Sequence, residues 1–186
     1  TNRHASPQAP ILIFLHEGLG CVEMWKDFPE EVCANTGLSA LIYDRQGYGQ
    51  SSPFTSLRKP NFMHIEADHY LPGVIKALHH PECIPVGHSD GGTIALLFAS
   101  HFPNMVRCAV TMAAHVFVEK ETLQGITQAK EVYQTSNWRD KLFKYHGEKT
   151  DSVFYAWADT WLSPEFAAWN IEPELQDIQA PLLVMQ

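Results

Sequence analysis

The sequence predicts an α/β fold in which a mostly parallel sheet is flanked by helices and carries an inserted helical lid. Three observations predict it. Short, continuous apolar runs alternate with helix-like stretches along the chain, which is the pattern of a parallel sheet covered on both faces. A G-x-S-x-G motif stands directly after one of these runs. A long, aromatic-rich stretch separates the last two runs.

The first part of the chain repeats the order strand, loop and helix. Residues 11–15 form a continuous apolar run, as a strand buried on both faces does. The run ends in a glycine-rich turn, residues 16–20, and residues 25–36 form a plausible helix. A second apolar run, residues 40–43, ends in the polar loop 44–51. Strands that alternate with helices in this way predict parallel pairing.

The middle of the chain carries a long helix followed by the G-x-S-x-G motif. Apolar residues at close to helical spacing predict a helix over residues 63–79, with a kink at Pro72 and Gly73. A strand-like run, residues 84–86, leads into the motif, and a helix of small and apolar residues, 92–100, follows it. A strand that reverses into a helix through a sharp turn is the setting of a nucleophile elbow.

Two further strands are predicted over residues 106–112 and 181–185. The stretch between them, residues 113–180, is much longer than the about 2–6 residues plus one helix of an ordinary connection. We expect an inserted helical lid, whose many aromatic residues suit the roof of an apolar pocket. The pocket candidates are Leu19, in the turn after the first strand, and Trp157 and Trp161, which lie one helical turn apart. The alternative is that most of these rings form the core of the lid.

Length and composition favour a single domain. With 186 residues, of which 45% are hydrophobic, the chain is long enough for one sizeable core and short for two. The expected organisation is an α/β core over residues 1–112, the helical lid over 113–180, and a return to the core sheet at 181–186.

The balance of charge restricts the class of partner. The chain has 13 Lys and Arg against 21 Asp and Glu, a net charge of −8, which argues against nucleic acid or an anionic membrane surface. A small uncharged or cationic molecule fits better. No apolar run approaches the ~18 residues that span a bilayer. The four cysteines are irregularly spaced and no secretory leader precedes them, so we expect free thiols and a cytoplasmic location.

The motif GHSDG, residues 87–91, provides a candidate nucleophile. Ser89 occupies the middle position, where the sharp turn exposes the side chain. A serine that attacks a carbonyl needs a general base and donors for the oxyanion. One donor is the backbone N–H of Asp90, and the other is expected from the turn after the first strand, with Gly18 as first choice and Leu19 as the alternative register. The Asp90 side chain is either an acid in the first turn of a helix or an attractor for a cationic substrate group.

Three motifs resemble the α/β-hydrolase fold superfamily: H-E-G at residues 16–18, D-R-x-G-x-G-x-S at 44–51 and GHSDGG at 87–92. The resemblance covers the chain almost end to end. Within the superfamily, the sequence most resembles small esterases and carbon–carbon bond hydrolases with a helical cap. The resemblance implies Ser89 as the nucleophile and an oxyanion donor in the early histidine–glycine turn. Glu17 stands where many relatives have glycine, so the donor stays open between Gly18 and Leu19.

The resemblance also implies a catalytic acid after the strand at 181–185 and a catalytic histidine after a further strand, whereas the sequence stops at Gln186. Glu119 is a weak alternative for the acid, because the order along the chain is normally Ser, acid, His. His88 is expected to point into the sheet or its neighbours and not at Ser89, because adjacent strand residues face opposite ways. His16 is expected to order the turn after the first strand by hydrogen bonding. Soluble proteins avoid an exposed apolar edge strand, so we expect the sequence to be a truncated part of a longer hydrolase.

No metal site or cofactor is expected. His64 and His69 have acidic residues between them, but their spacing does not place both imidazoles on one helical face. The glycines of residues 47–49 lack the third glycine and the following helix of a dinucleotide fingerprint, and no Walker pattern is present.

The sequence therefore predicts a serine hydrolase that transfers the acyl group of a small, largely apolar ester to water. Carbon–carbon bond hydrolysis on the same fold is the alternative within the enzymes. Outside the enzymes, the alternatives are a ligand-binding or receptor-like protein that keeps the elbow and the pocket without catalysis, or an inactive fragment.

Overall fold

A computed structural model describes residues 9–80 and 82–186. Its centre is a five-stranded sheet in the order β2-β1-β3-β4-β5, in which all neighbouring strands are parallel. The strands are β1 (Ile11–Leu15), β2 (Ala40–Ile42), β3 (Cys83–His88), β4 (Ala109–Met112) and β5 (Leu182–Met185). The predicted α/β class with a parallel sheet is confirmed, and each strand overlaps an apolar run of the sequence.

The helices before β5 fall into two sets, one around the sheet and one between β4 and β5. Around the sheet lie η1 (Val22–Trp25), α1 (Phe28–Thr36), α2 (Phe62–Ile65), the π-helix η2 (Glu66–Tyr70), α3 (Leu71–Leu78), α4 (Asp90–His101) and η3 (Pro103–Met105). Between β4 and β5 lie α5 (Lys120–Thr135), α6 (Trp138–His146), η4 (Gly147–Lys149), α7 (Thr150–Trp161) and η5 (Glu174–Asp177).

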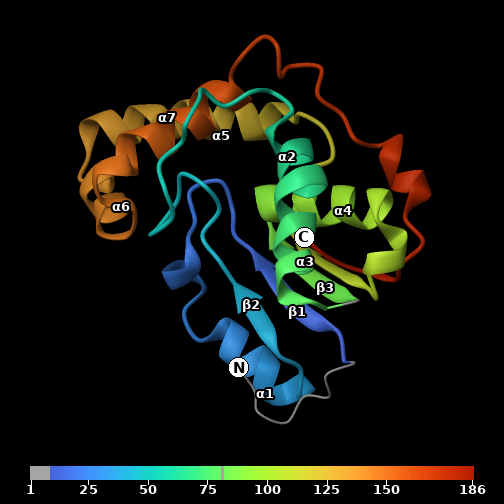
Figure 1. Cartoon of the computed structure of the whole chain (residues 1–186). Coiled ribbons are helices and arrows are strands. Elements are labelled where there is room, and N and C mark those ends of the chain that lie inside the picture. The colour runs from blue at the N-terminus through green and yellow to red at the C-terminus, as the bar shows by residue number, and fades with distance from the viewer. Residues whose placement is uncertain (1–8, 81) are drawn as a thin grey trace.

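Helices cover both faces of the sheet, as alternate residues of β1 show. Ile11, Ile13 and Leu15 belong to the larger core with α2, α3 and α4, whereas Leu12 and Phe14 pack toward α1. Figure 1 shows α1 on one side of the sheet and α3 and α4 on the other. Because side chains of a strand point alternately to opposite faces, a strand with two covered faces must be apolar throughout.

Two helices differ in detail from the sequence prediction. The helix expected over residues 25–36 begins at Phe28, because Lys26 has a positive φ of 51°, which interrupts the helix. The kinked helix expected over residues 63–79 runs instead through the π-helix η2 between α2 and α3. Pro72 lies in the first turn of α3 and has no N–H for the preceding turn, so the wider turn replaces a regular α register.

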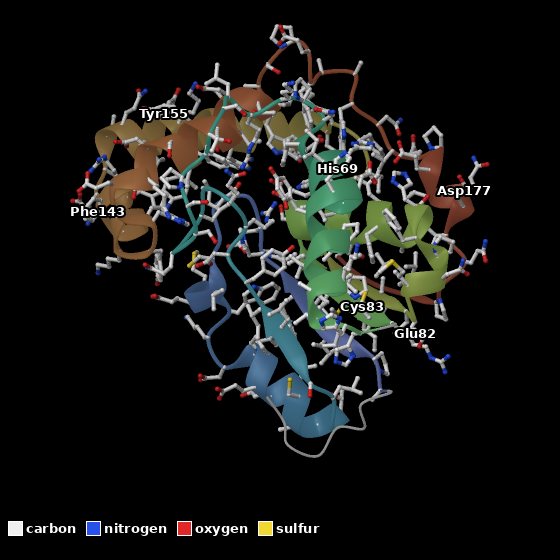
Figure 2. The ribbon with its side chains drawn as sticks, in the orientation of Figure 1. His69, Glu82, Cys83, Phe143, Tyr155 and Asp177 are labelled. Carbon is white, nitrogen blue, oxygen red and sulfur yellow. The ribbon has the colours of Figure 1, made fainter. Side chains whose placement is uncertain are left out.

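The helical segment between β4 and β5 extends the larger core of the sheet with many aromatic rings. Figure 1 shows α5, α6 and α7 grouped at one end of the molecule, away from α1. The rings of Tyr133 and Phe154 stack with centroids 3.7 Å apart, and Trp138 packs edge-on against Phe154. Phe143 lies on α6 at the outer margin of this segment (Figure 2) and is 39% exposed. Much of the aromatic content predicted for a pocket roof therefore holds these helices together.

The last strand, β5, is exposed along its whole length, and Val184 reaches 62%. All four cysteines are free thiols, with Cys83 buried at the start of β3 (Figure 2). Over residues 9–80 and 82–186, no helix combines the length and the apolar character that crossing a membrane requires.

Candidate active site

Ser89 lies in the turn between β3 and α4. Its backbone has φ 51° and ψ −119°, a conformation that costs a non-glycine residue about 1–3 kcal/mol unless its surroundings hold it. The Ser89 N–H donates to the Met112 carbonyl at 2.8 Å, and the Thr93 N–H donates to the Ser89 carbonyl at 3.0 Å. The turn is therefore held by β4 on one side and by the first turn of α4 on the other.

Glycines make this turn possible by letting backbone segments touch. A Cβ on Gly87 would lie 2.5 Å from the amide nitrogen of Gly92 and would overlap the carbonyl group of Gly91. A Cβ on Gly91 would lie 2.7 Å from the carbonyl oxygen of His16. Both outer positions of the motif therefore require glycine, and Gly91 allows α4 to begin against the end of β1.

The glycine-rich turn after β1 lies beside the start of α4. The Gly20 N–H donates to the Glu17 carbonyl at 3.2 Å, which leaves Gly18 and Leu19 at the two central positions of a four-residue turn. A Cβ on Gly18 would lie 3.0 Å from Asp90 Oδ2. Among the described residues, the backbone N–H groups of Gly18, Leu19 and Asp90 donate no hydrogen bond. Gly18 therefore lies beside the Asp90 side chain, and the N–H groups of all three residues have no acceptor among the described residues.

His16 and Arg45 set the direction of one peptide in this turn. Both are buried. His16 Nδ1–H donates to the Glu17 carbonyl at 2.9 Å, and Arg45 Nη2 donates to the carbonyls of His16 and Glu17 at 2.8 and 3.0 Å. The C=O and N–H groups of a trans peptide point in opposite directions. Holding the Glu17 carbonyl therefore aims the Gly18 N–H away from His16 and Arg45.

His16 is held in its neutral form by its contacts. The Arg45 backbone N–H donates to His16 Nε2 at 3.2 Å, so this nitrogen must keep its lone pair while Nδ1 carries the proton. Burial lowers the pKa of His16 well below its ordinary value of 6.5, and the Arg45 charge lowers it further. The expectation that His16 orders this loop by hydrogen bonding agrees with these contacts.

The Asp90 carboxylate is buried next to a positive charge. No hydrogen bond to it is found among the described residues, but Arg58 Nη1 lies 4.0 Å from its Oδ2, with both side chains at most 5% exposed. Arg58 also donates to the Tyr48 hydroxyl and lies over the Phe62 ring at 4.4 Å from its centroid. Asp90 thus has a counter-charge within the protein, which weakens the interpretation that it attracts a cationic substrate group.

The two predicted pocket tryptophans lie in different places. A Cβ on Gly18 would come within 2.7 Å of Trp157 Nε1, so Trp157 packs against the turn beside Ser89. Trp161 is only 1% exposed, and its ring packs edge-on against His115 and Phe166, with centroids 5.0 and 4.9 Å away. The Trp161 ring is thus buried in the larger core, and its role in a pocket, like that of Trp157, stays a prediction.

The histidines near the elbow are engaged elsewhere. His88 Nδ1 lies 3.5 Å from Glu17 Oε2; this contact raises the pKa of His88 above 6.5, although burial opposes the shift. His115 Nδ1 lies 3.1 Å from Glu119 Oε2. In the part of the chain that the structure describes, no hydrogen bond joins a histidine to the Ser89 hydroxyl.

The histidines and acidic residues near residue 64 contact protein groups and do not gather around a metal site. His64 Nε2 lies 3.2 Å from Glu174 Oε1, on η5, and His69 is exposed on the outer side of its helix (Figure 2). No group of three or more His, Cys, Asp or Glu side chains among the described residues has an arrangement that would hold a metal ion.

Sequence reasoning missed two residues of the helical segment that contact the core: His146 at the end of α6 and Lys149 at the end of η4. His146 Nε2–H donates to the Leu19 carbonyl at 2.9 Å, and the Gly49 N–H donates to His146 Nδ1 at 3.0 Å. Lys149 Nζ donates to the carbonyls of Gly49 and Tyr48 at 2.7 and 3.3 Å. These partners lie 97 to 127 residues away along the chain, so no local spacing signals them.

A groove of about 990 Å³ runs between α7 and the segment of residues 54–60. Tyr155 and Ala156 line it from α7, and Phe54 and Arg58 line it from the segment. Through Arg58, the wall of this groove reaches the Asp90 carboxylate next to Ser89.

Residues 10–185 match the family model described as the alpha/beta hydrolase fold. The chain belongs to this family. The order β2-β1-β3-β4-β5 and the turn at Ser89 are thus features of an alpha/beta hydrolase.

Curated relatives of this alpha/beta hydrolase align over little more than half of the chain. The chain is 29% identical over 101 residues to the sn-1-specific diacylglycerol lipase ABHD11 of Danio rerio. This alignment covers 54% of the chain and 30% of the relative. The chain is also 29% identical over 104 residues to the serine hydrolase BPHL of Mus musculus, in an alignment that covers 56% of the chain and 34% of the relative. The alignments span about a third of the length of these relatives.

Solved structures show the same fold over nearly the whole chain. A carboxylesterase of the thaumarchaeon Nitrososphaera gargenis superposes with a TM-score of 0.75 at 16% identity, covering 97% of this chain and 73% of that one. A thermophilic esterase of Thermogutta terrifontis superposes with a TM-score of 0.64 at 18% identity, covering 95% and 71%. At such identities the likeness establishes the fold.

Proposed function

We propose that this alpha/beta hydrolase is a serine hydrolase that transfers the acyl group of an ester to water, with Ser89 as the nucleophile. The observation that carries the proposal is the strained backbone of Ser89 at the end of β3. Strain of this kind is concentrated at active sites, because the surrounding structure must hold it. The free N–H groups of the neighbouring turn and of Asp90 support the same function.

The reaction would proceed in two steps. Ser89 Oγ attacks the ester carbonyl carbon while its proton passes to a general base, and the carbonyl oxygen becomes an oxyanion. The N–H groups of Asp90 and of Gly18 or Leu19 would stabilise that charge. The alcohol leaves with the proton, and water then attacks the acyl-serine and releases the acid. The proposal takes the general base to be a histidine, as in other serine hydrolases. None of the contacts of the described residues identifies which histidine it is.

The groove between α7 and residues 54–60 is the proposed binding site for a small, largely apolar substrate. Phe54 and Tyr155 supply aromatic walls, and Arg58 connects the groove to Asp90. Replacing Ala156 with Trp would fill part of this groove. We expect A156W to lower kcat/KM for esters with longer acyl chains much more than for an acetate ester of the same alcohol. An equal loss for all chain lengths would remove the groove from the proposal.

The proposed nucleophile is tested by labelling. The natural protein is treated with a fluorophosphonate, which reacts with activated serines, and its intact mass is measured before and after. We expect one adduct, which is lost in Ser89→Ala and kept in Ser136→Ala, a change at an exposed serine on the helical segment. A folded natural protein without an adduct, or an adduct that persists in Ser89→Ala, overturns the proposal. Saturable binding of an apolar ligand without an adduct would favour the ligand-binding alternative.

A further inference from the structure

His146 joins three parts of the molecule through one buried ring. It is the last residue of α6 and is 3% exposed. Its Nε2–H donates to the Leu19 carbonyl at 2.9 Å, and its Nδ1 accepts from the Gly49 N–H at 3.0 Å. The imidazole therefore connects the helical segment to the turn after β1 and to the loop after β2.

The turn needs such a connection on its Leu19 side. Gly18 and Gly20 flank Leu19, and glycine restricts the backbone less than any other residue. On the other side of the turn, His16 and Arg45 fix the Glu17 carbonyl. Of the described residues, only His146 donates a hydrogen bond to the Leu19 carbonyl. The position of the Leu19 peptide groups thus depends on a side chain from α6.

The two hydrogen bonds also specify the protonation state of the ring. The Gly49 N–H is a donor, so Nδ1 must keep its lone pair, and the Leu19 carbonyl is an acceptor, so Nε2 must carry the proton. A doubly protonated ring would direct a second N–H at the Gly49 N–H. Protonation of His146 therefore breaks its hydrogen bond with the Gly49 N–H and leaves only the bond to the Leu19 carbonyl.

The charges around the ring act in both directions. Burial lowers the pKa of His146 below 6.5, and Lys149 lowers it further, whereas the carbonyl of the turn, Asp44 and Glu17 raise it. His16 also faces His146 and is itself held neutral. The neutral form that the geometry requires is thus the form present at neutral pH.

We infer that His146, in its neutral Nε2–H form, is a positioning residue that holds the oxyanion-binding turn in place from the helical segment. The inference rests on the proposed function, since it gives the turn its role. Because the anchor is on α6, the geometry of the turn and the position of α6 are coupled. Loss of the anchor would slow acylation without changing the groove.

The test compares two variants, each of which removes hydrogen bonds between the helical segment and the core, with a third variant that restores one of these bonds. His146→Phe keeps a ring of similar size and removes both hydrogen bonds. Lys149→Met removes the bonds to the carbonyls of Tyr48, Gly49 and Ser51 and leaves the turn after β1 untouched, so it is the matched control. His146→Gln offers an amide that donates to the turn and serves as the rescue variant.

Two experiments are made on the natural protein and on each variant: ester hydrolysis, which gives kcat and KM, and amide hydrogen exchange at Gly20, whose N–H donates to the Glu17 carbonyl within the turn. We expect His146→Phe to lower kcat by about 10- to 100-fold with little change in KM and to accelerate exchange in the turn. Lys149→Met should change kcat by less than about threefold, and His146→Gln should recover part of the loss.

Three outcomes would overturn the inference: equal losses of kcat in His146→Phe and Lys149→Met, a loss confined to KM, or unchanged exchange in the turn of His146→Phe. A natural protein that is not acylated at all overturns the proposed function instead. The exchange comparison then still decides whether His146 holds the turn.

Discussion

Gly87 and Gly91 meet across the Ser89 turn with no space for a side chain between them. A Cβ on Gly87 would overlap the backbone carbonyl of Gly91, which belongs to the first turn of α4 and cannot move aside as a flexible side chain would. The distance between β3 and α4 at this point is therefore set by backbone contact. The conformation of Ser89 depends on that distance.

We expect Gly87→Ala to lower the free energy of unfolding by about 1–3 kcal/mol or more, because the added methyl group must displace backbone atoms. Gly125→Ala is the matched control: a Cβ there meets nothing within 4 Å, and the residue lies within α5. It should stabilise the protein by about 0.5–1 kcal/mol. Urea unfolding measures both. Equal stabilities of wild type and Gly87→Ala would contradict the close contact.

The strain at Ser89 should be measurable as a gain of stability when it is relieved. Ser89→Gly removes the Cβ that disfavours a φ of 51°, so we expect the variant to be more stable by about 1 kcal/mol and to lose fluorophosphonate labelling. Lys26 has nearly the same backbone conformation, with φ 51° and ψ −130°, at an exposed turn. Lys26→Gly should gain similar stability and keep the label. A destabilised Ser89→Gly would argue against strain.

Arg45 should be intolerant of a change that preserves only its charge. The guanidinium of Arg45 donates to the carbonyls of both His16 and Glu17. A lysine at this position has no planar guanidinium to reach both, so one buried carbonyl is left without a hydrogen bond. We expect Arg45→Lys to lose about 1–3 kcal/mol of unfolding free energy. Arg139→Lys, in an ion pair with Asp151 that is almost half exposed, should lose less than about 1 kcal/mol. Denaturant unfolding of both variants makes the comparison; equal losses would refute the role given to Arg45.

The neutral His16 predicts a loss of stability in acid. Because its pKa is lowered in the folded protein, the unfolded chain binds more protons below pH 6.5, and the free energy of unfolding falls as the pH falls. One such group contributes at most about 1.4 kcal/mol per pH unit. We expect His16→Asn, measured by urea unfolding between about pH 7.5 and pH 5.5, to show a shallower decline than wild type.

His88 provides a control of opposite sign. Its pKa is raised by the contact with Glu17, so its contribution to stability is present below the unfolded pKa and is lost as the pH rises through the folded one. Removing it in His88→Gln should make the acid decline steeper. If both variants follow the wild-type pH dependence, neither histidine contributes as argued.

The sheet and the Ser89 turn could be predicted because their signals are local. Residues 11–15 must be apolar throughout to lie in a sheet covered on both faces, and residues 87–91 must have glycine at both ends to let backbones touch. His146 and Arg58 could not be predicted in the same way. Their partners lie far away along the chain, and only the packing of α6 and of residues 54–60 brings them to the turn and to Asp90.

The aromatic stretch shows a different limit of sequence reasoning. Trp157 and Trp161 are one helical turn apart and equally apolar, yet Trp157 packs against Gly18 and Trp161 is buried against His115 and Phe166. Spacing defines which residues share a side of a helix. It does not define what that side meets, which depends on how α5, α6 and α7 pack together.

The π-helix η2 holds one residue more than a regular α-turn while turning the chain through nearly the same angle. A one-residue deletion within η2 would therefore restore a regular α-helix and keep Phe62 and Met63, now 7% and 0% exposed, on the core side. Within α3, by contrast, there is no extra residue to remove. A one-residue deletion there rotates the preceding helix by about 100°, since a regular turn contains 3.6 residues, and carries Phe62 and Met63 away from the core. In homologous proteins, a one-residue difference in length should therefore be accepted within η2 and excluded from α3.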